Sequence, residues 1–327
     1  MPHARSETAA EAAVVGADGF IGTHLVRTLR TAGVPTAAFT RTRPFAVGGR
    51  PHPDLCSART VYFLATSVNI GMAEHRPDLL AADRALFATF QRTVAAAGHR
   101  PVVVLTSSGG AVYDPAVPPP YREESPVRPV TAYGRGKAAM EAEVIGCGDT
   151  LRPVITRLSN PYGPGQRLGT GQGVIAHWLD AALRGEPLRL FGNPLATRDY
   201  VYIDDAIEAL VRIHHRTAQA SLPVVLNIGS GQPTALTELV DIVCEVAAEL
   251  RPVVELATER YYDRRDTWLD VSAAQQALDW VATASLHSGI GRTWQHVRAG
   301  VTPAVTNLPP SALPPSAIEE RTWSRQP

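Results

Sequence analysis

The chain has 327 residues, with 31 basic and 31 acidic side chains, so its formal net charge is zero. At roughly 150 residues per domain this length predicts about two domains, and it excludes a peptide hormone, a disulfide-stapled toxin and a small zinc module. Hydrophobic residues make up 45% and charged residues 19%, as in an ordinary folded protein. The neutral charge balance argues against nucleic acid or an anionic membrane as a partner.

The basic side chains comprise 30 arginines and a single lysine, Lys137. A compositional pressure toward Arg exchanges Lys wherever any cation serves, so the remaining Lys indicates a position that needs an ammonium group. Survival of one Lys by chance explains the count equally well.

Three cysteines have neither the even number of a disulfide framework nor the spacing of a zinc site. No apolar run approaches the ~20 residues of a membrane span. We therefore expect a cytoplasmic protein without a metal.

Apolar runs alternate with helix-length segments along the first half of the chain. Strands are predicted at 12–17, 34–40, 61–66 and 101–108, and helices at about 20–32, 79–97 and 131–145. Runs that are apolar throughout are typical of strands buried on both faces, and helices between them indicate a parallel sheet of βαβ units. The sequence therefore predicts an α/β fold with a Rossmann-type doubly wound parallel sheet.

Gly16, Gly19 and Gly22 lie between the first predicted strand and the first predicted helix, in the segment GADGFIG. Backbone without Cβ atoms turns tightly and lets a pyrophosphate approach the helix N-terminus, where free N–H groups and the helix dipole favour an anion. The spacing differs from the GxGxxG of the usual fingerprint, so a structural turn is the alternative. The strand before and the helix after favour a dinucleotide site.

The second predicted strand ends in Phe39-Thr40-Arg41-Thr42-Arg43. A fold that prefers NAD usually has Asp or Glu here for the ribose hydroxyls, whereas an Arg accommodates the 2′-phosphate of NADP. The acid is absent, so the segment favours NADP(H). NAD(H) is the alternative if these are ordinary surface arginines.

Further strands are predicted at 153–159 and near 224–231, and a helix at 173–185. We expect a dinucleotide-binding domain at 11–167, its sheet completed by strands from about 200–230, and an interleaved, smaller C-terminal substrate-binding α/β domain at 168–300. Residues 1–10 are expected to be a flexible N-terminus. Residues 301–327, rich in Pro and Ser, are expected to be a loosely attached tail.

Tyr133 and Lys137 are four residues apart in YGRGK, which places both side chains on one face of the helix predicted at 131–145. A phenol with an ordinary pKa of about 10 is a poor acid-base catalyst near neutrality, and a neighbouring cation lowers that pKa. The ammonium can also donate to the ribose of a nicotinamide cofactor. A surface pair is the alternative, against which the uniqueness of Lys137 argues.

Six segments, GADGFIG, TSSGGAVY, YGRGK, RLSNPYGPGQ, RDYVYIDDA and LNIGSG, follow in this order within about residues 12–300. The chain thereby resembles the extended short-chain dehydrogenase/reductase family, specifically its nucleotide-sugar epimerases, dehydratases and ketoreductases. The resemblance implies that Tyr133 is the general acid/base, that Lys137 tunes it, and that a Ser or Thr holds the reacting sugar oxygen. The usual hydroxyl position holds Gly109, so we assign this role to its neighbour Ser108.

The resemblance also implies a binding site for each ligand. The residues expected to contact the cofactor are Gly16, Gly19, Phe20, Ile21, Gly22, Arg41, Leu64, Ala65, Tyr133 and Lys137. Those expected to contact a nucleotide-diphosphate sugar are Ser108, Asn160, Arg198 and Arg264. The chain departs from the family at Asp83, where Asn is common, and in the turn Gly192-Asn193-Pro194-Leu195. A homodimer through the helices at 79–97 and 131–145 is also implied.

Dehydratases of this family carry an Asp-Glu pair after the hydroxyl residue, because eliminating water needs an extra acid and base. This chain has Gly109-Gly110-Ala111 there, which disfavours dehydration. We expect NADPH-dependent reduction of a nucleotide (dTDP-like) 4-keto-6-deoxyhexose to the 4-hydroxy sugar in deoxysugar biosynthesis, with Tyr133 as general acid. An NAD-dependent nucleotide-sugar 4-epimerase is the alternative, and a non-catalytic NAD(P)-binding sensor is the third possibility.

Overall fold

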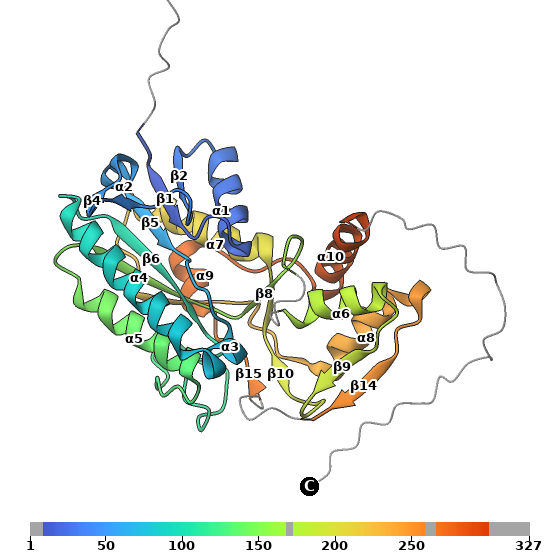
Figure 1. Cartoon of the computed structure of the whole chain (residues 1–327). Helices are drawn as coiled ribbons and strands as arrows, with labels where there is room; N and C mark the ends of the chain where they lie inside the picture. The colour runs from blue at the N-terminus through green and yellow to red at the C-terminus, as the bar shows by residue number, and fades with distance from the viewer. Residues whose placement is uncertain (1–8, 168–172, 259–265, 301–327) are drawn as a thin grey trace, which may run out of the picture.

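A computed structural model of the chain describes residues 9–167, 173–258 and 266–300 (Figure 1). The tail predicted at 301–327 and most of the N-terminal segment predicted at 1–10 lie outside these residues. Arg264, one of the predicted substrate residues, also lies outside them.

Six parallel strands form the main sheet, in the order β12-β7-β6-β5-β1-β2. Their bounds are β1 Ala12–Val15, β2 Thr36–Phe39, β5 Thr60–Phe63, β6 Val102–Ser108, β7 Arg152–Leu158 and β12 Val225–Ile228. The strand order reverses at β1, which lies between β2 and β5, and ligands of such sheets bind above the carboxyl ends at this point. The prediction of a Rossmann-type α/β fold is confirmed.

The strands are largely apolar because both faces of the sheet are covered. Val14 and Tyr62 point into one hydrophobic cluster, and their neighbours Val15 and Phe63 point into another. This alternation follows from the two-residue period of a strand. Burial on both faces fixes the register of the strands, because a slip by one residue would exchange the two sets.

Helices α1 (Phe20–Thr31) and α7 (Ile203–Arg216) cover one face of the sheet, and α4 (Pro77–Ala96) and α5 (Ala132–Gly146) cover the other (Figure 1). On the α4 side, the rings of Phe87 and Phe90 lie 4.9 and 4.8 Å from that of Phe63, measured between centroids. On the α7 side, the hydroxyl of Tyr62 donates to the carbonyl of Leu210 at 2.9 Å. Smaller elements on this part of the chain are β3 Ala46–Val47, β4 Arg50–Pro51, α2 Pro53–Ser57, α3 Ile70–His75 and α9 Ser272–Leu278.

A smaller unit lies beside the main sheet, on the right in Figure 1. It contains α6 Val174–Leu183, β9 Leu188–Phe191, α8 Leu236–Val246, the short helix Ala248–Leu250, β14 Val254–Ala257 and α10 Leu286–Gly300. Strands β9 and β14 pair in parallel, and Trp178 of α6 donates from Nε1 to the carbonyl of Arg189 at 2.9 Å. Short strands join the two parts: β8 Asn160–Tyr162 pairs with β11 Tyr200–Tyr202, and β10 Thr197–Arg198 lies between β13 Thr234–Ala235 and β15 Asp266–Thr267.

Within the three described stretches, no helix has both the length and the apolar character required to cross a membrane.

Candidate active site

A cleft of about 1110 Å³ opens between the carboxyl ends of the main sheet and the smaller unit. Its wall contains all but one of the predicted site residues that the structure describes. These are Gly16, Gly19, Phe20, Ile21, Gly22, Arg41, Leu64, Ser108, Tyr133, Lys137, Asn160 and Arg198. The exception is Ala65, which does not line the cleft, because its backbone packs directly behind the first glycine: a Cβ atom on Gly16 would lie 2.8 Å from the Ala65 nitrogen.

The glycine turn is fastened to the end of β2. The backbone N–H groups of Gly16 and Ala17 donate to the carbonyl of Phe39 at 3.0 and 3.1 Å, and Gly16 has a φ of +89°, which favours glycine. A Cβ atom on Gly22 would collide with the carbonyl oxygen of Gly16. Among the described residues, no side chain caps the N-terminus of α1 at Gly19, so the first N–H groups of the helix are available to an anion. This cradle fits the pyrophosphate of a dinucleotide.

The two arginines after β2 have different environments. Arg43 donates to Asp54 at 2.7 Å and to the carbonyl of Ala38 at 3.0 Å, and its guanidinium lies over the ring of Phe39. Arg41 is exposed and lines the cleft, and no other described residue forms an ion pair with it. Only Arg41 is therefore available to a ligand.

Tyr133 and Lys137 lie on the first turns of α5, as the spacing predicts. Thr131 caps the helix by accepting a hydrogen bond from the N–H of Gly134 at 3.0 Å. Lys137 is 7% exposed, and its ammonium donates to the carbonyl of Thr106 at 3.1 Å and lies 5.7 Å from the centroid of the Tyr133 ring. The pair thus lies at the carboxyl end of β6, where a bound cofactor and substrate would meet.

Burial dominates the electrostatics of this pair. It raises the pKa of Tyr133 to about 12, with the carboxylate of Asp83 acting in the same direction. Burial lowers the pKa of Lys137 to about 8, against the opposing charges of Asp83 and Glu141. The expectation of a lowered pKa for the phenol is therefore wrong for the protein without ligands, because burial and then Asp83 raise it. The resulting form, a neutral phenol beside an ammonium, is a proton donor at neutral pH.

Ser108 and Gly109 differ from the usual pattern for structural reasons. Ser107 donates to the buried carboxylate of Glu141, so its hydroxyl is engaged inside the protein. Ser108, the next residue of β6, points to the opposite face and lines the cleft. A Cβ atom on Gly109 would lie only 2.6 Å from Cδ1 of Leu269. A residue larger than glycine would therefore require the end of the Leu269 side chain to move.

The predicted substrate residues Asn160 and Arg198 lie across the cleft from the glycine turn. Asn160 donates to the carbonyl of Asp199 at 2.8 Å, and Arg198 donates to the carbonyl of Thr197 at 2.8 Å. The buried carboxylate of Asp199 accepts hydrogen bonds from the N–H and the hydroxyl of Ser230 at 2.8 Å each. It thereby anchors the strand that carries Arg198 to the loop after β12.

Four buried side-chain oxygens on the cleft wall have no hydrogen-bond partner within the described part of the chain. They are the hydroxyls of Thr106, Ser159 and Thr267 and the amide oxygen of Gln166. Buried polar atoms are nearly always hydrogen-bonded in folded proteins, so their gathering at one cleft indicates a polar ligand. Together with the glycine cradle, they fit a dinucleotide cofactor and a sugar.

Several cleft residues were missed at the sequence level. Thr66, Ser67 and Val68 follow β5 and line the cleft, and the convergence of strand ends in a parallel sheet could have found them. Trp178 and Phe191 line it from the smaller unit. No local signal marks these two, because their position depends on how the two parts pack.

The fold and the cleft define a Rossmann-type protein with a dinucleotide site and a tyrosine-lysine pair. Residues 12–229 match the model of the NAD dependent epimerase/dehydratase family, and the chain belongs to this family. The resemblance identified from the motifs is thereby confirmed.

Two curated relatives illustrate the range of the family. The chain is 33% identical over 199 residues to UDP-glucose 4-epimerase of Mycolicibacterium smegmatis, covering 60% of this chain and 62% of the relative. It is 28% identical over 198 residues to dTDP-4-dehydro-6-deoxyglucose reductase of Escherichia coli, covering 60% and 61%. The chain thus matches about three fifths of the length of these relatives.

The structure is also similar to that of UDP-glucose 4-epimerase from Thermus thermophilus in complex with NAD. The TM-score is 0.76 at 28% sequence identity, and the match covers 89% of this chain and 99% of that one. The similarity therefore extends over both the main sheet and the smaller unit.

Proposed function

We propose that this protein is an NADPH-dependent reductase of a nucleotide-linked 4-keto-6-deoxyhexose. The observation that carries the proposal is Arg41, an exposed guanidinium on the cleft wall with no ion-pair partner among the described residues. It lies where an acid would select NAD, and it suits a 2′-phosphate instead. NADPH is consumed in a net reduction, which favours a reductase over an epimerase.

A bound nicotinamide would supply the hydride. Tyr133 gives its phenolic proton to the developing alkoxide of the sugar, and its raised pKa keeps that proton available at neutral pH. Lys137, held by the carbonyl of Thr106, presents its ammonium to the ribose and to the phenol. Ser108 donates to the sugar oxygen from the end of β6. The three side chains therefore hold and move one proton at one oxygen.

Arg198 and Asn160 orient the substrate by its diphosphate. A guanidinium gives bidentate, charge-assisted bonds to phosphate oxygens, and the buried Asp199 holds the strand that carries it. Arg264 is proposed to assist from the segment before β15. The relative from Escherichia coli is a reductase of a dTDP-linked keto sugar, which supports this substrate class.

The test is a turnover assay with purified protein, NADPH and a dTDP-4-keto-6-deoxyhexose. With a reductase, the absorbance of NADPH falls in proportion to the sugar added. Tyr133→Phe is expected to abolish most of this decrease. Equal rates for the two proteins would contradict the mechanism. Binding of NADPH without turnover of any keto sugar would favour a non-catalytic sensor instead.

A nucleotide-sugar 4-epimerase is the second candidate, favoured by the similarity to two UDP-glucose 4-epimerases. An epimerase returns the hydride to the sugar and so needs no added cofactor. Purified protein that carries bound NAD and interconverts UDP-glucose and UDP-galactose would establish this activity. It would also refute the reductase proposal.

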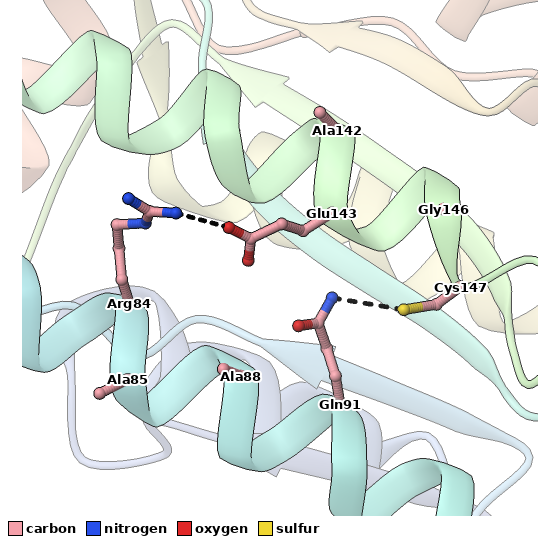
Figure 2. A pocket seen from close by; sticks show the side chains of 8 residues that line it. All are labelled: Arg84, Ala85, Ala88, Gln91, Ala142, Glu143, Gly146 and Cys147. Atoms are coloured by element: carbon pink, nitrogen blue, oxygen red, sulfur yellow. Dashed lines mark hydrogen bonds and ion pairs between the residues drawn. The ribbon is translucent and has the colours of Figure 1, made fainter.

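We also propose that two copies of the chain associate through α4 and α5. Figure 2 shows a shallow groove between these helices, lined by Arg84, Ala85, Ala88, Gln91, Ala142, Glu143, Gly146 and Cys147. Many of these side chains are small, and Arg84 and Glu143 pair across the groove at 2.8 Å. Leu86 and Ile145 on the same helices are 39% and 49% exposed. A second copy would cover these apolar side chains.

A further inference from the structure

Asp83 is a buried carboxylate that the proton transfer described above does not use. It lies on α4, is 8% exposed, and accepts hydrogen bonds from three donor groups in the loop after β5. The N–H of Ser67 donates to it at 2.8 Å, the hydroxyl of Thr66 donates at 3.0 Å, and the hydroxyl of Ser67 is a further donor. All of these donors are neutral, so the negative charge of Asp83 is not compensated by its hydrogen bonds.

Asp83 lies on the part of α4 that packs against the start of α5. Leu80, one turn earlier on α4, packs so tightly on Gly136 that a Cβ atom there would lie 2.8 Å from Cδ1 of Leu80. Gly136 directly precedes Lys137. The hydrogen-bond donors of Asp83, Thr66 and Ser67, line the same cleft as Tyr133 and Lys137. The charge of Asp83 accordingly acts on both groups of the pair.

Other titratable groups on the elements packed around the pair include Glu141, Glu74, Arg84 and His75. Glu141 on α5 forms a buried ion pair with Arg157 of β7 at 2.7 Å. Glu74 on α3 accepts a hydrogen bond from the N–H of Ala132 at 2.6 Å, at the start of α5. Arg84 on α4 is turned toward the outer surface, where it pairs with Glu143. His75 on α3 is exposed.

We propose that Asp83 is a positioning residue that supplies the counter-charge of the Tyr133–Lys137 pair, holding Lys137 as an ammonium and Tyr133 as a neutral phenol. Its hydrogen bonds to Thr66 and Ser67 also fix the loop that forms the cleft wall beside the pair. The proposal deepens the proposed function, because it concerns the proton-transfer residues of the same site.

The direction of the effect follows from the sign of the charge. A carboxylate disfavours a second negative charge on the phenol and favours the positive charge of the ammonium, so it raises the pKa of both groups. Removing the charge therefore lowers both pKa values. Lys137 then loses its proton at a lower pH.

The uniqueness of Lys137 provides a direct measurement. Incorporation of lysine labelled with ¹³C at Cε gives one lysine signal from the chain, whose chemical shift reports the protonation of Lys137 by NMR. In Asp83→Asn, which keeps the shape and accepts from Ser67, the midpoint of this titration is expected to fall by roughly one pH unit. The matched control is Asp78→Asn, on the same helix, where the carboxylate pairs with the exposed Arg76. Its midpoint is expected to equal that of the wild type.

Equal midpoints in the wild type and Asp83→Asn would overturn the proposal. If the amide variant does not fold, Asp83→Ser is the second neutral variant for the same titration. In the turnover assay, the alkaline limb of kcat/KM is expected to move to lower pH by the same amount in Asp83→Asn. A loss of kcat with an unmoved limb would mean that Asp83 only supports the loop, and would also refute the proposal. The NMR titration needs no substrate, so failure of the proposed reductase activity is distinguishable from failure of this inference.

Discussion

Replacement of Arg41 by Ala tests the choice of cofactor. The guanidinium is exposed on the cleft wall, and no ion pair links it to any other described residue. The substitution therefore leaves no internal group unpaired, and surface changes of this kind usually alter stability by less than about 0.5 kcal/mol. A change in cofactor affinity can then be attributed to the lost cation.

The magnitude follows from the contact that Arg41 would make. A hydrogen bond to a charged group contributes about 1.5–3 kcal/mol, and the exposure of Arg41 favours the lower half of that range. Since 1.4 kcal/mol corresponds to a tenfold change in Kd, the Kd for NADPH is expected to rise about 10- to 40-fold in Arg41→Ala. NADH lacks the 2′-phosphate, so its Kd is expected to stay unchanged.

The assay is a fluorescence titration of purified protein with each cofactor. Arg43→Ala is the matched control, because Arg43 is held by Asp54 and by the carbonyl of Ala38. Its loss is expected to affect the binding of NADPH and NADH equally. An unchanged Kd for NADPH in Arg41→Ala, or equal weakening of both cofactors, would refute the assignment of the 2′-phosphate site.

Four further predictions concern the pair on α5, the core and the surface. Lys137→Arg keeps the charge but places it differently, so kcat is expected to fall at least about 100-fold. Steady-state rates near those of the wild type would mean that the position does not need a lysine and that the single Lys is there by chance. In the wild type, kcat/KM for reduction is expected to decline as the pH rises through about 8, where Lys137 of the free protein loses its proton; a kcat/KM that is flat to pH 10 would contradict this. Glu141→Gln leaves the buried guanidinium of Arg157 without its counter-charge, and the free energy of unfolding is expected to fall by about 3–5 kcal/mol in urea titrations. Ala88→Arg places a bulky cation in the groove of Figure 2. Light scattering is expected to show a dimer for the wild type and a monomer for this variant. A wild-type protein that is itself a monomer would refute the proposed dimer.

The parts of the fold that local patterns determine were predicted well. The helix predicted at about 20–32 is α1, Phe20–Thr31, and the one predicted at about 131–145 is α5, Ala132–Gly146. Both begin at signals that are readable in the sequence, a glycine turn after a strand and a Thr cap. The strands were found because a doubly covered sheet requires uninterrupted apolar runs. The assignment of 11–167 and 168–300 to separate domains remains a prediction.

Short elements were missed because they carry little periodicity. The helix α3, Ile70–His75, has only six residues, too few for an amphipathic pattern. Its cap was readable, since Asn69 accepts a hydrogen bond from the N–H of Met72 at 2.8 Å. Similarly, β3 and β4 have two residues each. Such segments are specified by their neighbours rather than by their own sequence.

The candidate site divides in the same way between local and distant determinants. Motif residues at strand ends reach one cleft because a parallel sheet brings those ends together. The environment of each motif residue depends on residues far away in the chain. Gly109 departs from the usual pattern, and the side chain that packs beside it is that of Leu269, 160 residues later in the chain. Ser107 and Ser108 both line the cleft, and the hydroxyl of Ser107 is bonded to Glu141, so Ser108 is the one proposed to bind the substrate. The space around this proposed position therefore depends on a contact that no single motif contains.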